Sequence, residues 1–260
     1  MITSTQNPRI QWVRRLQGKS KYRQADNVFV IEGVRLIEEA QSANWGFRYI
    51  FFTETLGDRG KKLVDHFIGS ETKLELISAN VMQAISDTKN PQGILAVLEM
   101  KSLPLPGRLD FVLILDRLRD PGNLGAILRT AAAANVQAVF LTTGSVDAYS
   151  PKVLRAGMGA QFRLPIQYKD WIEIKNQVKS ASLKIYLATS GGGISCYEAG
   201  FQHPLALIIG GEADGASDSI LQSADSRVMI PMPGGGDSLN AAVAAGILLF
   251  EITRQRGSKP

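Results

Sequence analysis

Three short loops rich in glycine or polar residues each follow an apolar run that predicts a β-strand. They are Gly191-Gly-Gly193, Gly210-Gly-Glu212 and Pro231-Met-Pro-Gly-Gly-Gly236. In an open α/β sheet, ligands bind beyond the carboxyl ends of the strands, and glycine lets the backbone approach a ligand closely. We therefore expect the three loops to line one ligand pocket. Tight turns without a ligand are the alternative interpretation.

A second candidate site is a basic segment at the N-terminus, where residues 1–25 include six basic side chains and no acidic one. The basic residues are Arg9, Arg14, Arg15, Lys19, Lys21 and Arg23, with Gln6, Asn7, Trp12 and Tyr22 among them. Cations contact phosphates and aromatic rings stack on bases, so the segment is a candidate RNA-binding surface. A solvated helix face is the alternative. The net charge of +5 fits a polyanionic partner without establishing one.

Several common chemistries lack the residues that they need. The chain has one cysteine, Cys196, and two histidines, so neither an internal disulfide nor a metal site is predicted. The glycine-rich loops do not spell a dinucleotide fingerprint, and no serine hydrolase elbow is present. The apolar stretches are short and no secretory signal opens the chain, so we expect a soluble cytoplasmic protein.

The elements that position the loops form an α/β pattern in two halves. Prolines and a glycine interrupt the segment 101–108, so we predict domains at 1–100 and 109–260 that are joined by a linker at 101–108. In the first half, apolar periodicity predicts helices at 10–16, 34–43 and 59–67 and strands at 28–31, 48–53 and 93–98.

The second half opens with an apolar run at 111–116, which is typical of a strand buried on both faces of a parallel sheet. Asp120-Pro-Gly-Asn123 predicts a turn and cap before a helix from about Leu124 to Ala134. Strands are predicted at 138–142, 184–189, 205–209 and 227–231, and a nearly apolar last helix at 239–254. The small residues of that helix favour close packing in the core, at a subunit interface, or both.

Three segments in this order resemble the motifs of the SpoU/TrmH branch of the SPOUT RNA methyltransferases. They are 115–130, in which Arg129 follows Asn123 by six residues, 208–215 and 230–244. Through 2–8, 29–33 and 87–93, the first half resembles a substrate-binding domain similar to RNA-binding ribosomal proteins. The resemblance implies S-adenosylmethionine-dependent methylation of a ribose 2′-hydroxyl in structured RNA, with rRNA favoured over tRNA. It also implies a deep trefoil knot in the C-terminal parallel-sheet domain and a homodimer.

Carried over position by position, the resemblance assigns two sets of residues. The residues expected to bind the methyl donor are Thr189, Gly210, Gly211, Ile230, Met232, Ser238 and Leu239. The residues expected to take part in catalysis are Asn123, Arg129, Glu212, Ser238 and Asn240. Arg129 is also expected to contact RNA, together with Arg9, Arg14, Arg15 and Lys19 of the basic segment, which are predicted from their charge.

The spacing of the first motif limits how its residues can act. On a regular helix, six residues leave Asn123 and Arg129 about 120° out of alignment, so we expect Asn123 at the helix cap. Arginine stays protonated, so we expect Arg129 to hold the RNA backbone and stabilise charge rather than accept a proton. Glu212 is expected to anchor the pocket or accept hydrogen bonds from RNA. Ser238 is equally explained as a helix cap, whereas the start of the last helix does not require Asn240.

Two other functions stay open from the sequence. One is methylation of a base nitrogen by a SPOUT enzyme, which requires an acidic base near the donor. The other is an RNA-binding protein that keeps the fold without catalysis. The presence of all five expected catalytic residues argues against the second.

Overall fold

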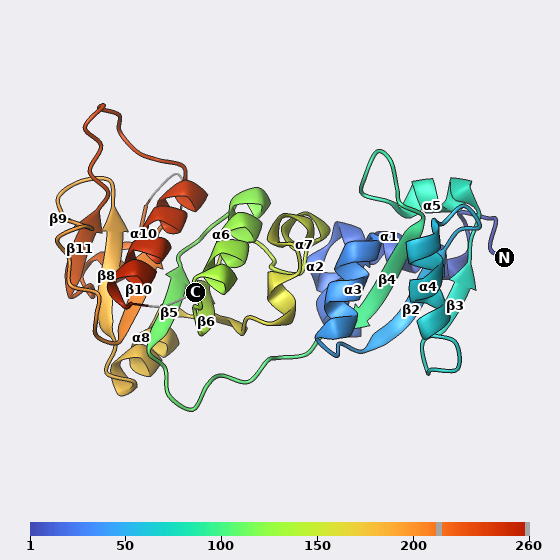
Figure 1. Cartoon of the computed structure of the whole chain (residues 1–260), viewed down its shortest axis with the longest axis horizontal. Helices are drawn as coiled ribbons and strands as arrows, with labels where there is room; N and C mark the ends of the chain where they lie inside the picture. The colour runs from blue at the N-terminus through green and yellow to red at the C-terminus, as the bar shows by residue number, and fades with distance from the viewer. Residues whose placement is uncertain (212–214, 258–260) are drawn as a thin grey trace. The chain divides into compact units, whose positions relative to one another are not determined.

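The computed structural model describes residues 1–211 and 215–257 (Figure 1). Contacts divide the chain into two compact units. Unit 1 comprises Met1–Lys101 and Tyr149–Phe162, and unit 2 comprises Ser102–Ala148 and Arg163–Pro260. A piece of the second half of the sequence therefore folds into unit 1, which the predicted division at a single linker did not include.

Unit 1 is built on a mixed sheet of four strands in the order β1-β4-β2-β3. Strand β4 pairs antiparallel with β1 and β2, and β2 pairs parallel with β3. The strands are β1 (Val28–Glu32), β2 (Phe47–Phe52), β3 (Lys73–Leu76) and β4 (Ile94–Glu99). The helices are α1 (Pro8–Gly18), α2 (Ser20–Asp26), α3 (Val34–Ser42), α4 (Asp58–His66), α5 (Ala79–Ile85), α7 (Pro151–Gly157) and the 3₁₀ turn η1 (Ala160–Phe162). The three helices and three strands predicted here are confirmed, with ends shifted by no more than two residues.

An aromatic cluster joins the segment Tyr149–Phe162 to the rest of unit 1. The ring of Phe29 on β1 lies 5.0 Å from that of Tyr149 and 5.4 Å from that of Trp45. Trp45 Nε1 donates a hydrogen bond of 3.1 Å to the carbonyl of Phe162. Because Phe29, Trp45 and Phe162 are buried, this segment is part of the core of unit 1.

Unit 2 is built on a parallel sheet of seven strands in the order β7-β6-β5-β10-β8-β11-β9. The strands are β5 (Phe111–Leu115), β6 (Ala138–Thr142), β7 (Ile166–Lys169), β8 (Lys184–Thr189), β9 (Ile194–Ser195), β10 (Leu205–Ile209) and β11 (Ser226–Met229). The helices are α6 (Pro121–Ala133), α8 (Trp171–Ser180), α9 (Asp218–Leu221) and α10 (Ala241–Gln255). Helices α6 and α10 pack side by side (Figure 1). The predicted parallel α/β sheet is confirmed.

The central strands β5 and β10 are buried along their whole length, as their continuous apolar sequence predicts. Alternate residues of β5 point to opposite faces, and Val112 and Ile114 pack with Phe140, Ile174 and Ile208 on one of them. The rigid centre of the sheet thus fixes where the loops after β5 and β10 begin.

Two connections pass from one side of β8 to the other, one between β9 and β10 and one between β10 and β11. After β8 the chain forms β9 at the far edge and returns to β10 on the other side of β8, and it then crosses back to β11. Strand pairing alone does not define how these segments thread, so the trefoil knot stays a prediction. No helix among the described residues is long and apolar enough to cross a membrane.

Candidate active site

A cavity of about 720 Å³ lies at the carboxyl ends of β8, β10 and β11 and beside the start of α10. This volume suits a small-molecule ligand. The seven residues that the sequence predicts for the methyl donor all line it, namely Thr189, Gly210, Gly211, Ile230, Met232, Ser238 and Leu239. Two of the three glycine-rich loops contribute to the lining, one through Gly210, Gly211 and Gly215 and the other through Met232, whereas Gly191-Gly-Gly193 is not part of it.

Backbone groups form the wall of the cavity after β10. A Cβ atom on Gly210 would lie 2.5 Å from both Ala216 N and Gly215 C, so no other residue fits without moving the loop. Gly211 and Gly215, which both line the cavity, exchange two backbone hydrogen bonds of 3.1 Å. Glu212, which the sequence predicts as a catalytic residue, lies outside the described residues.

Two predicted catalytic side chains from distant parts of the chain meet at this end of unit 2. Asn240 Nδ2 donates a hydrogen bond of 3.0 Å to Asn123 Oδ1. Asn240 lines the cavity and is also the N-cap of α10, since its Oδ1 accepts from the amides of Ala242 and Val243. Of the two candidate caps, Asn240 rather than Ser238 caps the last helix, and the expectation that the helix start does not require Asn240 is wrong.

Asn123 does not occupy the cap of α6 that its predicted role required. Asp120 is the N-cap, because its Oδ1 accepts a hydrogen bond of 2.7 Å from the Asn123 amide and Pro121 takes the first helical position. The helix thus begins three residues earlier than predicted. Asn123 and Arg129 both lie within α6 and point about 120° apart around its axis, so they act from different sides of the helix.

Arg129 is exposed on α6 and has no hydrogen bond or ion pair to the part of the chain that the structure describes. It does not line the cavity. A charged group in this state is available to a polyanionic ligand.

Asp116 is a residue that sequence reasoning missed. It follows β5 directly, is 2% exposed, and accepts hydrogen bonds from Thr142 Oγ1 (2.7 Å) and the Ser217 amide (2.8 Å). A buried carboxylate requires such partners. The signal in the sequence was an acidic residue at the very end of an apolar run.

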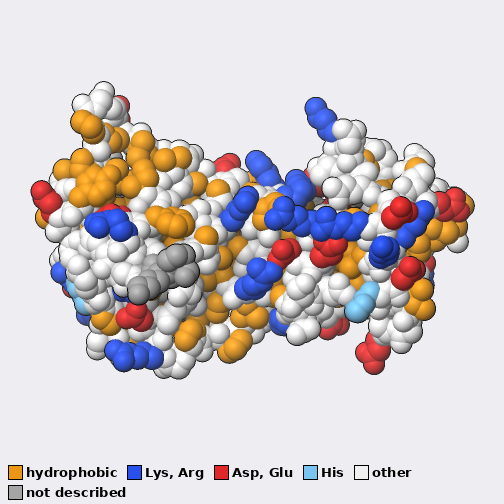
Figure 2. Space-filling model, in the orientation of Figure 1, with side chains coloured by type: hydrophobic (Ala, Val, Ile, Leu, Met, Phe, Trp, Pro, Cys, Tyr) orange, Lys and Arg blue, Asp and Glu red, His pale blue; other side chains and the backbone are white. Residues whose placement is uncertain are grey.

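The predicted RNA-binding residues of unit 1 differ in their exposure and in whether other side chains contact them. Arg14 and Lys19 are exposed and have no side-chain hydrogen bond or ion pair to the described residues. The guanidinium of Arg15 lies 5.8 Å from the Tyr22 ring centre. Arg9 forms an ion pair with Glu75. Figure 2 shows a run of Lys and Arg side chains across unit 1.

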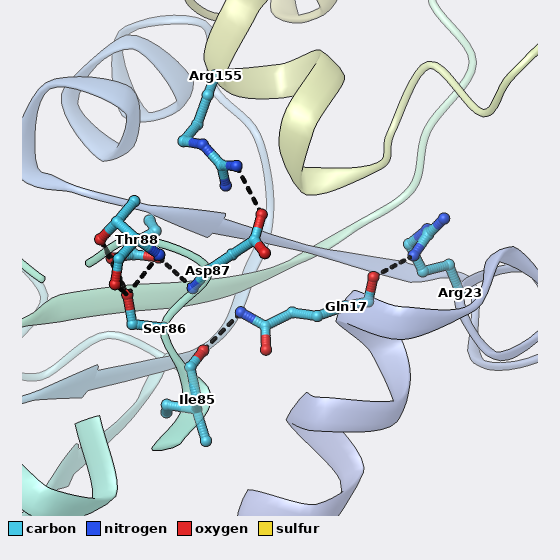
Figure 3. Close-up of polar contacts among 8 residues, drawn as sticks. Gln17, Arg23, Ile85, Ser86, Asp87, Thr88 and Arg155 are labelled. Carbon is cyan, nitrogen blue, oxygen red and sulfur yellow. Dashed lines mark hydrogen bonds and ion pairs between the residues drawn. The ribbon is translucent and has the colours of Figure 1, made fainter. Parts of the chain in front are cut away.

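Arg23 belongs to the basic segment by sequence but not to this surface. It is 3% exposed, and its Nη1 donates to the carbonyls of Leu16 and Gln17 at 2.5 and 3.2 Å (Figure 3). Arg23 therefore closes the end of α1 and is not available to RNA.

Two of the motifs that carry the resemblance in the first half meet in a polar network. Glu32 accepts hydrogen bonds from Ser86 Oγ (2.6 Å), Thr88 Oγ1 (2.7 Å) and the Asp87 amide (3.1 Å). Arg155 of α7 donates a bond of 2.6 Å to Asp87 (Figure 3). The network fixes the loop before β4 and stabilises the unit.

Thiol and imidazole groups lie away from the cavity. Cys196 is buried, and burial raises the pKa of its thiol, which disfavours the reactive thiolate. His203 hydrogen-bonds with the Tyr186 hydroxyl at 3.2 Å, and burial, followed by Lys184 and Arg256, lowers its pKa. No cluster of three potential metal ligands occurs within residues 1–211 and 215–257.

Comparison with known proteins defines the class to which this architecture belongs. The model of the SpoU rRNA Methylase family matches residues 110–250, and that of the MRM3-like substrate binding domain matches residues 7–96. The chain belongs to the SpoU rRNA methylase family. The resemblance predicted from the sequence is thereby confirmed.

Individual relatives match nearly the whole chain. It is 31% identical to the 23S rRNA (guanosine(2553)-2′-O)-methyltransferase RlmP of Bacillus subtilis, over 96% of this chain and 98% of that protein. It is 35% identical to an uncharacterized tRNA/rRNA methyltransferase of Synechocystis, over 98% and 94%. The crystal structure of the SpoU methyltransferase AviRb from Streptomyces viridochromogenes in complex with AdoMet matches with a TM-score of 0.87 and 28% identity, over 96% and 99%.

Proposed function

We propose that this protein transfers a methyl group from S-adenosylmethionine to a ribose 2′-hydroxyl of ribosomal RNA. The observation that carries the proposal is the convergence of all seven predicted donor residues on one cavity. Relatives named as rRNA 2′-O-methyltransferases, which match the chain from end to end, support the same reaction.

The cavity fits the methyl donor through its shape and its lining. Gly210 lets the returning end of the loop pack directly against its backbone at the cavity wall, and Ile230 and Leu239 offer apolar surface for an adenine ring. When bound, S-adenosylmethionine supplies an electrophilic methyl group. The residues that line the cavity would hold the donor there, with main-chain groups of Gly210 and Gly211 at its wall.

The residues around the cavity then position the RNA. Arg129 offers a planar, permanently charged group that can hold a phosphate and stabilise the developing negative charge on the ribose oxygen. Asn123 and Asn240 hold each other by their hydrogen bond, and Asn240 lines the cavity, so the bond links the start of α6 to the proposed donor site. Ser238 and Glu212 complete the proposed catalytic set.

The direct test is transfer of radiolabelled methyl from S-adenosylmethionine to unmodified rRNA and, in parallel, tRNA, followed by digestion to nucleosides. A labelled 2′-O-methylnucleoside from rRNA is the expected product. A methylated base would replace the proposal with base methylation, and failure to bind the donor in calorimetry would favour a non-catalytic RNA-binding protein.

We also propose a homodimer that forms through α10. Val243, Gly246, Ile247 and Phe250 lie on one stripe of the helix, and Val243 and Phe250 are each 51% exposed. Figure 2 shows hydrophobic side chains gathered around this part of unit 2. Exposed apolar stripes of this kind support subunit contacts. Since α10 also lines the cavity, a second subunit on this stripe would lie next to the site.

Replacing Phe250 with glutamate is expected to convert a dimer into a monomer, because a charge would be buried without a partner in the interface. Analytical ultracentrifugation measures this directly, against a monomer mass of 28.2 kDa. Ile172→Glu on α8, where the side chain is 69% exposed, is the matched control and is expected to remain dimeric. A dimeric Phe250→Glu variant or a monomeric wild type would reject this interface.

Unit 1 is proposed to bind RNA through α1 and the residue that follows it. Replacing Arg14, Arg15 and Lys19 together with glutamine is expected to weaken RNA binding and lower the slope of log K against log salt by about two units. Filter binding at a series of salt concentrations gives the slope. Neutralising Lys61, Lys62 and Lys179, on α4 and α8, is the control with equal charge loss. An equal effect in both variants would show general electrostatic attraction rather than a site.

A location in the cytoplasm is part of the proposal for a bacterial host, where the substrate is made. Relatives include the mitochondrial rRNA methyltransferase 3 of Homo sapiens, so another compartment that contains ribosomes fits the same reaction. Fractionation with ribosomal markers tests it.

A further inference from the structure

One buried residue holds both ends of the loop that forms the cavity wall after β10. The Asp116 amide donates a hydrogen bond of 2.9 Å to the carbonyl of Ile209, the last residue of β10. The Asp116 carboxylate accepts a bond of 2.8 Å from the amide of Ser217, at the other end of the loop. Between these two points, Gly210, Gly211, Gly215 and Ala216 line the cavity.

The same carboxylate connects this loop to the neighbouring strands. Strand β5, which Asp116 follows, lies between β6 and β10 in the sheet. Thr142 Oγ1 at the end of β6 donates to Asp116 Oδ1 at 2.7 Å and accepts from the Arg117 amide at 2.9 Å. A hydrogen bond to a buried charge is stronger than one between neutral groups, so these links form a stiff base for the loop.

The backbone next to Asp116 also limits how far the wall can move. A Cβ atom on Gly211 would lie 2.9 Å from the Arg117 carbonyl oxygen and 3.3 Å from that of Asp116. Arg117 adopts φ 52°, a left-handed conformation that costs energy for a residue with a side chain. The turn that brings the two segments into contact is therefore fixed at this point.

We propose that Asp116 is a positioning residue for the methyl donor, which sets the place of the cavity wall through the Ser217 amide. Asp116 is not among the residues that line the cavity, so it acts through the loop and not by contact with the donor. The inference rests on the proposed function, because it assumes that this cavity binds S-adenosylmethionine.

The test replaces the hydrogen bond between Ser217 and Asp116 with an unfavourable contact. Ser217 has φ −65°, which proline also adopts, so Ser217→Pro keeps this backbone angle, deletes the amide hydrogen and places the ring Cδ against Asp116 Oδ2. Ser217→Ala keeps the amide and is the matched control. We expect Ser217→Pro to raise the Kd for S-adenosylmethionine in calorimetry by about tenfold or more, and Ser217→Ala to leave it within about twofold.

Steady-state kinetics and melting temperatures distinguish a positioning role of Asp116 from a role in stability alone. In steady-state assays, Ser217→Pro is expected to raise the KM for the donor and to retain most of kcat at saturating donor. Thr142→Val removes the other hydrogen-bond donor to the Asp116 carboxylate, leaves its ion pair with Arg117 Nε at 3.6 Å, and is expected to lower Tm with a much smaller change in donor Kd. Loss of donor affinity in both variants in proportion to their loss of Tm would overturn the proposal, as would wild-type affinity in Ser217→Pro.

Asp116→Asn provides a second test if Ser217→Pro does not fold. Hydrogen exchange of the peptide that spans 210–217 is expected to become about tenfold faster, while exchange in β5 and β6 stays unchanged and donor binding weakens. Unchanged exchange in that peptide would overturn the proposal. A wild-type protein that binds no S-adenosylmethionine would instead reject the proposed function itself.

Discussion

Replacing Arg129 with alanine is expected to lower the rate of methyl transfer by about a thousandfold and to leave the affinity for S-adenosylmethionine within about threefold. Arg129 is exposed on α6, outside the cavity lining, so its loss removes a contact to RNA and not to the donor. Single-turnover transfer assays and calorimetry with the donor measure the two effects separately.

Arg129→Lys tests whether the positive charge of Arg129 is sufficient or whether the planar guanidinium group is also needed. Lysine keeps the positive charge but cannot form two parallel hydrogen bonds to a phosphate, so partial activity is expected. Arg48→Ala on β2 of unit 1, whose guanidinium pairs with Glu99, is a control for the loss of an exposed arginine and should retain the wild-type rate. A loss of donor affinity in Arg129→Ala would contradict the assigned role.

Replacing Gly210 with alanine is expected to weaken donor binding by at least about a hundredfold, because the new methyl group would overlap backbone atoms of the cavity wall. The affected atoms are Ala216 N and Gly215 C, which would lie 2.5 Å away, and backbone atoms cannot rotate aside as side chains can. Calorimetry with S-adenosylmethionine gives the affinity, and the melting temperature reports the accompanying loss of stability.

Gly200→Ala is the matched control for this substitution. Gly200 lies in unit 2 outside the cavity lining, and its Cβ atom would meet the Gln202 side chain at an ordinary 3.5 Å. Wild-type affinity is expected in this variant. If Gly210→Ala also bound the donor normally, the loop after β10 would not be the donor-binding wall.

The elements that could be predicted from the sequence are those whose burial leaves a strong local pattern. Strands β5 and β10 lie in the middle of the sheet, and five apolar residues in a row identify each of them. Strands β3, β7 and β9 were not predicted. All three are edge strands of two to four residues with few or no buried positions, so they carry no clear apolar alternation.

In the candidate site, too, local features could be predicted from the sequence and contacts between distant residues could not. Its glycine-rich loops are local features, and the sequence correctly places two of the three around one cavity, whereas Gly191-Gly-Gly193 is not part of the lining. The pairs Asn123–Asn240 and Asp116–Ser217 join residues 117 and 101 positions apart, and no local pattern carries such information. The sequence did not decide which residue caps the last helix, because Ser238, two residues before Asn240, is an equally good cap by residue type.

Charge alone was also an incomplete guide to the RNA surface. Arg23 has the same charge as its neighbours in the basic segment. Its side chain is nevertheless buried, because it donates hydrogen bonds to the carbonyls at the end of α1, which have no partner within the helix. Whether a cation faces solvent depends on where the preceding helix ends and how the next one turns back, which composition does not determine.

The segment Tyr149–Phe162 has a consequence for any attempt to prepare unit 1 by itself. The chain passes between the two units three times, after residues 101, 148 and 162. A fragment of residues 1–101 would leave the rings of Phe29 and Trp45 without those of Tyr149 and Phe162. Such a fragment is therefore expected to be less stable than unit 1 in the full chain, because large buried aromatic rings would become exposed to water.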